Sequence, residues 1–199
     1  GAAFHYAGDS IGGAVGLLEP QVAPVVAIGL ADDLLAGPER GFAGHLRAGR
    51  TTGVLKLVGI PLVGLLATRR LSGALLVGLT ANALNQLDTK PGRALKAYAL
   101  AALPARAPLL PAVLIAPYDL REMGMLGDSG SNALGALLGL SSVERFAGGS
   151  RWAAIGALAA LNLLGELTSL GDALERTPVL RALDAAARQP LPRPRQCCV

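Results

Sequence analysis

The feature that most constrains the fold is a series of closely spaced apolar segments. Only 16% of the residues are charged, against roughly 25% in an ordinary soluble domain. The segments lie near residues 11–31, 53–67, 72–87, 94–104, 108–117, 131–146 and 152–167. This pattern predicts an all-α chain, a polytopic membrane protein with about six to seven transmembrane segments. A soluble helical domain with a core rich in Ala and Leu is the alternative.

Several of these segments are shorter than the roughly 20 residues that a spanning helix needs. The segments 94–104 and 108–117 are the weakest. The sequence "PARAP" separates them, so two short spans or one broken hairpin would fit equally well. The predicted domains are a membrane-embedded domain over residues 1–168 and a C-terminal tail over residues 169–199. We also expect a piece of the fold to precede Gly1, since the chain opens without Met or a signal pattern.

The distribution of Lys and Arg predicts an orientation. If the segments cross the bilayer alternately, 13 of the 18 basic residues fall on one side. The positive-inside rule makes that side cytoplasmic. Nearly all the chemically reactive side chains lie in the same connections, so we expect active-site loops on the cytoplasmic face of a bacterial inner membrane and no nucleic-acid partner. A homodimer stays open.

Asp32 and Asp33 stand at the end of the first apolar segment. Carboxylates at membrane level are costly and usually functional. Adjacent carboxylates raise each other's pKa unless a cation neutralises them. Their oxygens suit Mg²⁺, which prefers hard oxygen ligands. A solvated helix end is the simpler interpretation.

Asn82, Asn85 and Asp88 recur every three residues and form one polar stripe on a helix. Amides inside an apolar segment should face protein or a wet cleft, and hydrogen bonding between helices is the simpler interpretation. Lys90, Arg93 and Lys96 follow directly. Cations beside a carboxylate suit a substrate that carries phosphate.

The sequence "GDSGS" places Asp128 between two glycines just before an apolar helix. The amides at such a helix start favour anions, so Asp128 could cap the helix or hold a metal beside a phosphate. Ser131 follows in the same turn. The basic connection "GPERGFAGHLRAGRTTG" could bind phosphate or anionic head groups, and we count its Arg47, with Lys56 just beyond it, among the candidate substrate-binding residues.

The order of these motifs resembles the polyprenyl-phosphate N-acetylhexosamine-1-phosphate transferases. That order is Asp-Asp, a basic loop, Asn-x-x-Asn-x-x-Asp and then Gly-Asp-x-Gly-Ser, over residues 32–139. The resemblance implies a Mg²⁺-dependent membrane enzyme that moves a sugar-1-phosphate from a UDP-sugar to polyprenyl phosphate and releases UMP.

Roles for individual residues follow from the same resemblance. It implies catalytic roles for Asp32, Asp33 and Asp88, with the Asp pair near the lipid phosphate. It implies metal binding by Asp128, which we extend to Asp33. If this holds, Asp32, Asp33, Asp88 and Asp128 should converge around one metal ion or one bridging phosphate.

The chain departs from the family pattern in its nucleotide-reading parts. Thr89 and Pro91 stand where the family has Gly and a second Asp, and the stretch where the family has a His-rich loop has no histidine. The sugar donor is therefore open. The alternatives are a non-catalytic relative that binds lipid phosphate or metal and regulates envelope assembly, and a small transporter, which the one-sided polar residues disfavour.

Overall fold

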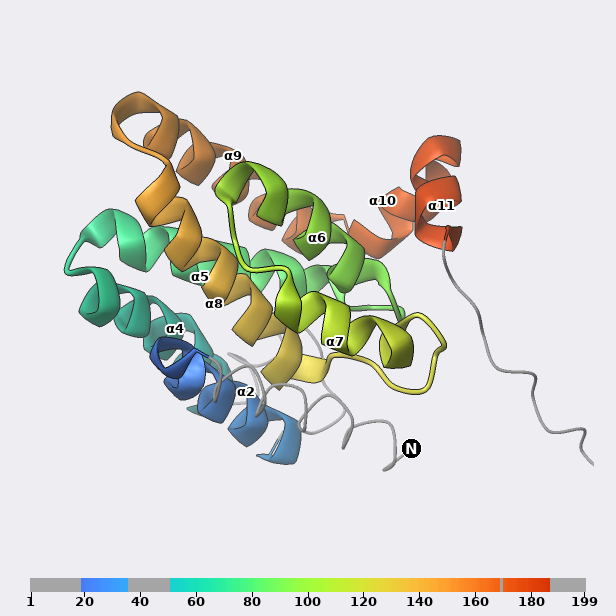
Figure 1. Ribbon diagram of the computed structural model, residues 1–199, viewed down its shortest axis with the longest axis horizontal. Coiled ribbons are helices and arrows are strands. Elements are labelled where there is room, and N and C mark those ends of the chain that lie inside the picture. The colour runs from blue at the N-terminus through green and yellow to red at the C-terminus, as the bar shows by residue number, and fades with distance from the viewer. Residues whose placement is uncertain (1–18, 36–50, 169, 187–199) are drawn as a thin grey trace, which may run out of the picture.

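The computed structural model describes residues 19–35, 51–168 and 170–186, without the side chains of 33–35, 51–52 and 172–174. Helices and short connections make up this part of the chain, which contains no strand (Figure 1). The elements are η1 (Pro20–Val22), α2 (Ala23–Leu35), α4 (Thr51–Thr68), α5 (Leu71–Leu87), α6 (Arg93–Ala105), α7 (Leu110–Asp119), α8 (Gly127–Arg145), α9 (Gly148–Leu167), α10 (Leu170–Arg176) and α11 (Pro178–Ala185).

The prediction of an all-α chain is confirmed. Each predicted segment from residue 53 onward coincides with one helix, in order from α4 to α9. The segment at 11–31 lies partly outside the described residues. "PARAP" separates two short helices, because α6 ends with Arg106 in the left-handed conformation at φ 55°. Across 19–35, 51–168 and 170–186, no helix combines the length and the apolar character needed to cross a bilayer.

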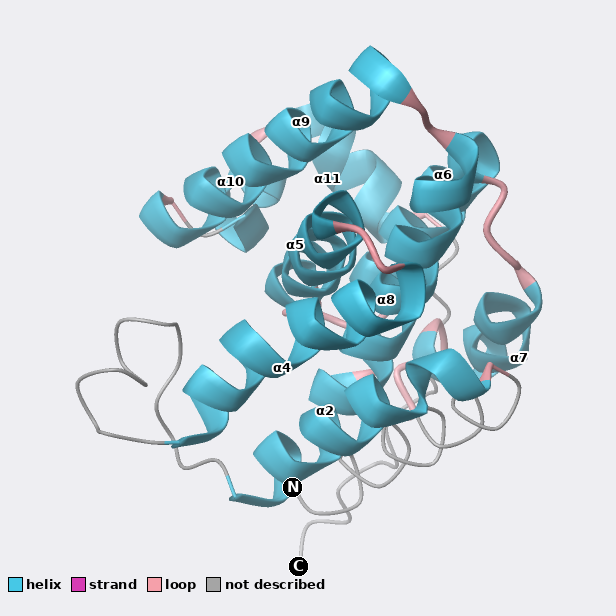
Figure 2. Ribbon diagram, turned by 90° about the vertical axis from the view of Figure 1, so that its left-hand side faces the viewer, coloured by secondary structure: helices cyan, strands magenta, loops and turns pink. Residues whose placement is uncertain are grey.

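α5 and α8 form the centre of the molecule and pack antiparallel, with the other helices arranged around them (Figure 2). Glycines let the two backbones approach closely. A Cβ added at Gly135 would lie 2.4 Å from Ala81 Cα, and one at Gly139 would lie 2.6 Å from Val77 Cα. The pairs step by four residues in opposite directions along the two helices, which defines the register.

The surrounding helices pack by similar close contacts. α4 contacts α5 where Gly78 faces Pro61 and Gly64 faces Val77. α2 lies against both α4 and the start of α8. α9 covers another side of α5, α6 packs against α8, and α7 contacts α6. This arrangement brings the end of α2 and the beginning of α8 together.

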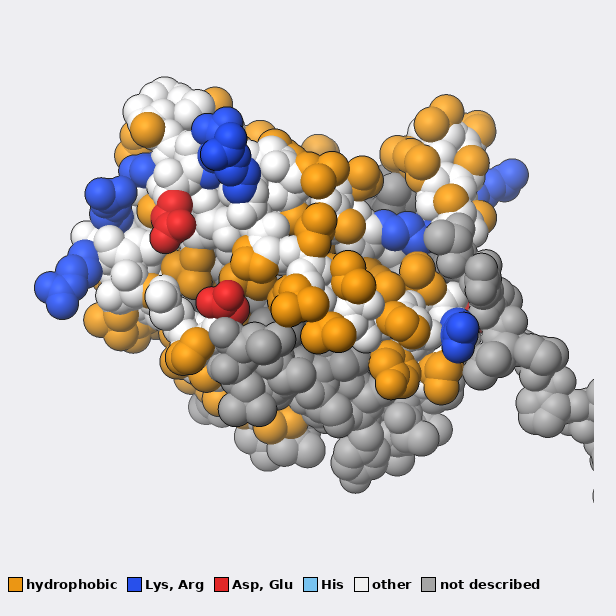
Figure 3. All heavy atoms as spheres, viewed as in Figure 1, with side chains coloured by type: hydrophobic (Ala, Val, Ile, Leu, Met, Phe, Trp, Pro, Cys, Tyr) orange, Lys and Arg blue, Asp and Glu red, His pale blue; other side chains and the backbone are white. Residues whose placement is uncertain are grey.

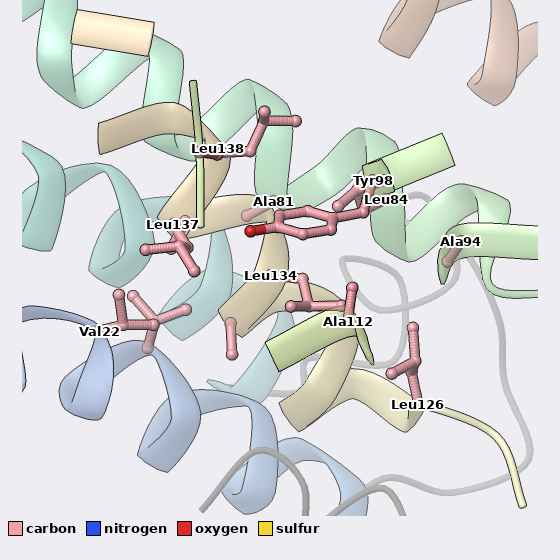
Figure 4. Close-up of a cluster of buried hydrophobic side chains, with 14 of the residues drawn as sticks. Val22, Ala81, Leu84, Ala94, Tyr98, Ala112, Leu126, Leu134, Leu137 and Leu138 are labelled. Atoms are coloured by element: carbon pink, nitrogen blue, oxygen red, sulfur yellow. The ribbon is translucent and has the colours of Figure 1, made fainter. Parts of the chain in front are cut away.

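The main apolar core lies between α2, α5, α6 and α8 (Figure 4). Leu134, Leu126 and Tyr98 are among its fully buried side chains. The Tyr98 hydroxyl donates to the carbonyl of Pro108, just beyond the end of α6. The buried phenol therefore keeps a hydrogen-bond partner, as buried polar groups require.

Much of the outer surface is also apolar. Hydrophobic side chains spread over the face that α6 and α7 present in Figure 3. Leu100, Leu103 and Val113 are more than 60% exposed on these two helices. On other sides of the molecule, Leu66 of α4 and Leu167 of α9 are about as exposed. Apolar patches of this extent usually contact another protein or a membrane.

Candidate functional site

A lysine and two aspartates from three different helices meet at the polar end of the bundle. The Lys56 ammonium group of α4 forms ion pairs with Asp32 of α2 and with Asp128 of α8. The exposed fractions of these side chains are 12% for Lys56, 3% for Asp32 and 25% for Asp128. We call this group the Lys56 cluster. It is only partly screened by water, so its charges interact more strongly than surface charges do.

The Lys56 cluster forms because α2 approaches α8 without side chains between them. A Cβ added at Gly29 would lie 2.6 Å from Ser129 Cα and 2.7 Å from the Asp128 carbonyl oxygen. Asp32 follows Gly29 by three residues, so it lies on the same side of α2. The sequence therefore needs glycine at position 29 to place the two carboxylates around one cation.

The start of α8 is well suited to hold a carboxylate. Gly127 has φ 64°, a conformation that glycine adopts readily, and Asp128 lies in the first helical turn. A negative side chain there is favoured by the positive end of the helix dipole. The side-chain amide of Asn132 donates to the backbone carbonyl of Asp128 at 2.7 Å, one helical turn earlier.

Asn85 and Ser131 are brought together as neighbours across the α5–α8 contact. The Ser131 hydroxyl lies 3.2 Å from the Asn85 side-chain oxygen and 2.7 Å from the Gly127 carbonyl. The antiparallel register that pairs Ser131 with Asn85 brings Asp88 to the same end of the bundle as Asp128. Asp88 is half-buried and caps α5. Two predicted substrate-binding residues, Asn85 and Ser131, and one predicted catalytic residue, Asp88, therefore lie at the same end of the α5–α8 pair as Asp128.

Asn82 faces a different helix. Its amide donates to the Asn162 side-chain oxygen of α9 at 2.5 Å, and the Asn162 amide donates to the Leu79 carbonyl at 3.0 Å. These contacts join α5 to α9, which is the interhelical role that the sequence left open for Asn82.

Lys90, Arg93 and Lys96 form a second charged group, which we call the basic cluster. Their acidic partners come from the C-terminal helices, and Arg93 also donates from Nη1 to the Thr89 hydroxyl at 2.6 Å. Arg93 donates from Nε to one Asp184 oxygen at 3.1 Å and from Nη2 to the other at 2.9 Å. Glu175 lies 2.5 Å from Lys90 Nζ and 3.3 Å from Arg93 Nη2.

The basic cluster changes the proton affinity of its members. Hydrogen bonding to Asp184 raises the pKa of Arg93 despite the opposing effect of burial. Hydrogen bonds from Lys90 and then Arg93 lower the pKa of the Glu175 carboxyl. Both shifts favour the charged forms, so the pairs are ionic at neutral pH.

Two predicted site residues lie beyond what the structure places. Arg47 falls outside the described residues. Asp33 belongs to α2, but its side chain is not described. Glu175 and Asp184 are the reverse case, because sequence reasoning did not single them out. The sequence does contain one signal for Asp184. It lies four residues after Leu180 in "PVLRALDA", so on a helix the carboxylate falls on the same side as an apolar residue.

The expected convergence of Asp32, Asp33, Asp88 and Asp128 around one metal or one bridging phosphate is testable only for the three whose side chains are described. Among the side chains that the structure describes, no group of three or more His, Cys, Asp or Glu could hold a metal ion. Asp32 and Asp128 do converge, and their shared partner is the Lys56 ammonium group. Proteins usually hold Mg²⁺ with one or two carboxylates plus substrate phosphates and water. The Lys56 ammonium group takes the position between the two carboxylates, so only Asp128, the more exposed of the two, would supply a ligand to a Mg²⁺ ion that binds together with phosphate.

The fold and the Lys56 cluster define the protein as a helical bundle with a charged site at one end of its central helix pair. Comparison with known protein families, with curated proteins and with solved structures finds no match.

Proposed function

We propose that this protein is a membrane-associated phosphotransferase that moves a sugar-1-phosphate from a UDP-sugar to a polyprenyl phosphate in cell-wall or surface-polysaccharide synthesis. An oxygen of the lipid phosphate attacks the phosphorus that carries the sugar. A new P–O bond forms, and the bond from that phosphorus to the oxygen of the second phosphate breaks. UMP leaves with the electron pair of that bond.

The observation that carries this proposal is the convergence of Asp32, Lys56 and Asp128 from three helices. Phosphoryl transfer depends on positioning and on charge stabilisation by fixed cations. Asp32 and Asp128 are nearly a hundred positions apart in the sequence, so only the fold brings them together.

Each side chain has a role in the proposed site. Lys56 contacts the anionic oxygens of the transferring group, and Asp32 accepts a proton from the lipid phosphate when that phosphate is protonated. Asp128 is the ligand that would hold Mg²⁺ together with the phosphates and water, and the ion when bound offsets the negative charge of the phosphates. Asn85 and Ser131 supply hydrogen bonds at the edge of the same site.

The apolar outer surface supports a lipid substrate and attachment to the inner membrane with the site toward the cytoplasm. Leu57 and Val58 on α4 and Leu163 on α9 are more than half exposed. Side chains of this kind are favourable in contact with lipid tails and unfavourable in contact with water. A lipid phosphate could then reach the Lys56 cluster from the membrane while the nucleotide sugar arrives from water.

The test is a transfer assay with purified protein, undecaprenyl phosphate, Mg²⁺ and either UDP-GlcNAc or UDP-MurNAc-pentapeptide labelled in the sugar. We expect labelled lipid from one donor, loss of product when EDTA removes Mg²⁺, and at least a hundredfold lower rate in Asp128→Asn. Glu144→Gln, an exposed acidic position at the far end of α8, is the matched control and should keep the wild-type rate. Product from Asp128→Asn at the rate of the control would refute the proposed site.

A second function is favoured by the fact that the cations of both clusters are already paired with carboxylates of the chain. Lys56 is already neutralised by two carboxylates, and the basic cluster is already paired with Glu175 and Asp184. A non-catalytic relative that binds a lipid phosphate or a metal and regulates envelope assembly would need no more than this. Binding of undecaprenyl phosphate with no transfer from any donor would favour this second function.

A further inference from the structure

The basic cluster has the composition of a phosphate-binding site. It contains three cations within seven residues, one in the connection after α5 and two in the first turn of α6. The Arg93 side chain is only 4% exposed, although arginine is almost never buried without an anion. Its guanidinium presents two parallel donors to Asp184, the same arrangement that arginine uses with phosphate.

The anions that occupy this site belong to the chain itself. Asp184 accepts two hydrogen bonds from Arg93, and Glu175 pairs with both Lys90 and Arg93. Lys96 donates to the carbonyls of Leu183 and Asp184 at the end of α11, where the helix dipole is negative. Two carboxylates and one helix end therefore surround the three cations.

α11 lies at the surface of the bundle. None of its residues is buried, and its Val179 and Leu183 are 69% and 55% exposed. Figure 1 shows α10 and α11 at the edge of the bundle, beside the end of α5 and the start of α6. A helix held mainly by ion pairs can be displaced by a competing anion, because no apolar core has to be opened.

We propose that α10 and α11 form an acidic cover over an anion-binding site, and that a ligand carrying phosphate displaces Glu175 and Asp184 from Lys90, Arg93 and Lys96. This inference rests on the proposed function in its choice of ligand, a diphosphate or a lipid phosphate. The cover restrains binding until the ligand competes for Arg93. Arg176 and Arg181 on the two helices are already exposed, and displacement of the helices frees the backbone beside them for proteolysis.

The direct test measures binding of inorganic pyrophosphate to the full chain by calorimetry. Asp184→Asn removes one competing carboxylate and should bind pyrophosphate about tenfold more tightly than wild type. Glu144→Gln removes the same charge far from the site and should bind like wild type. Glu175→Gln, at an exposed position, is a second variant that should also bind more tightly. Equal affinities in all four proteins would overturn the proposal.

Trypsin cleavage after Arg176 and Arg181 gives an independent readout. Pyrophosphate should accelerate cleavage at these sites in the wild type and leave it unchanged in Arg93→Gln. Acceleration in both proteins, or in neither, would contradict displacement of the cover. Parallel titrations with UDP and with vesicles that contain undecaprenyl phosphate then show whether the phosphate comes from a nucleotide or from a lipid.

The outcome separates this inference from the proposed reaction. Pyrophosphate binding needs neither sugar donor nor lipid, so tighter binding by Asp184→Asn with no transfer activity would keep the cover and remove the reaction. Transfer activity with unchanged affinity in Asp184→Asn would do the opposite.

Discussion

The Lys56 cluster and the basic cluster use the same side-chain chemistry in opposite proportions. In the Lys56 cluster one cation lies between two carboxylates, each fixed by a packed helix. In the basic cluster three cations meet two carboxylates, which come from α10 and α11 at the edge of the fold. The first arrangement is therefore part of the folded core, whereas the second can open while the core stays intact.

The largest effect is expected from Lys56→Met, which leaves Asp32 and Asp128 without their shared cation. Removing one partner of a buried ion pair costs about 3–5 kcal/mol of unfolding free energy. Denaturant unfolding followed by circular dichroism measures the loss. The double variant Lys56→Met with Asp32→Asn should recover part of it. A loss below about 1 kcal/mol would place the cluster among ordinary surface pairs.

Gly29→Ala tests whether close packing of α2 on α8 creates the Lys56 cluster. The added Cβ would lie 2.6 Å from Ser129 Cα, so one backbone must move, at a cost of about 1–3 kcal/mol. Gly156→Ala is the matched control, since nothing lies within 4 Å of a Cβ at that position. The control should be neutral or slightly stabilising. Equal unfolding free energies for the two variants would show that α2 can shift freely.

Arg93→Gln should loosen α10 and α11 and leave the core unchanged. It removes two charged hydrogen bonds to Asp184, so the local opening free energy should fall by about 1–2 kcal/mol. Trypsin cleavage after Arg181 should then become about tenfold faster, while the midpoint of global unfolding stays near the wild-type value. A large fall in that midpoint would mean that the basic cluster belongs to the core.

The smallest effect is a pH dependence at Glu175. The pKa of its carboxyl is lowered from an ordinary value of 4.5, so its pairing with Lys90 is fully present above that value. The contribution is lost as the pH falls through the lowered pKa. Hydrogen exchange in α10 should therefore accelerate only below about pH 4.5, and Glu175→Gln should remove this step. Acceleration already between pH 7 and 5 would point to another group.

The helices could be predicted because each apolar segment carries its own signal. The segments that begin near residues 53 and 72 are long apolar runs, which favour a helix by themselves. Pro91 and Gly92 separate α5 from α6. The span assignment depended on composition, and composition does not show how long each helix becomes. α6 and α7 are the exception, because "PARAP" and the short apolar segments on either side of it already predicted two short elements, and the helices have 13 and 10 residues.

The candidate site could be predicted only in part. Asp32, Asp88 and Asp128 were predicted as site residues because carboxylates are unusual at the ends of apolar segments. The sequence did not predict that Lys56 is the shared counter-ion of Asp32 and Asp128, because that contact depends on how α2 packs on α8 at Gly29. Asn82 shows the converse, because its spacing matched the site while its contacts join α5 to α9. The pairing of Arg93 with Asp184 joins positions about ninety residues apart, and no local sequence pattern predicts such a contact.

The central claim is that the Lys56 cluster serves transfer of a sugar-1-phosphate to a lipid. The most direct measurement follows phosphorus through the reaction, with UDP-GlcNAc or UDP-MurNAc-pentapeptide labelled in the phosphate next to the sugar or in the phosphate next to uridine. We expect that the first label enters the lipid fraction, that the second is released in UMP, and that Asp128→Asn lowers lipid labelling and UMP release together. Failure of the first label to enter lipid with either donor, or entry of the second, would contradict it.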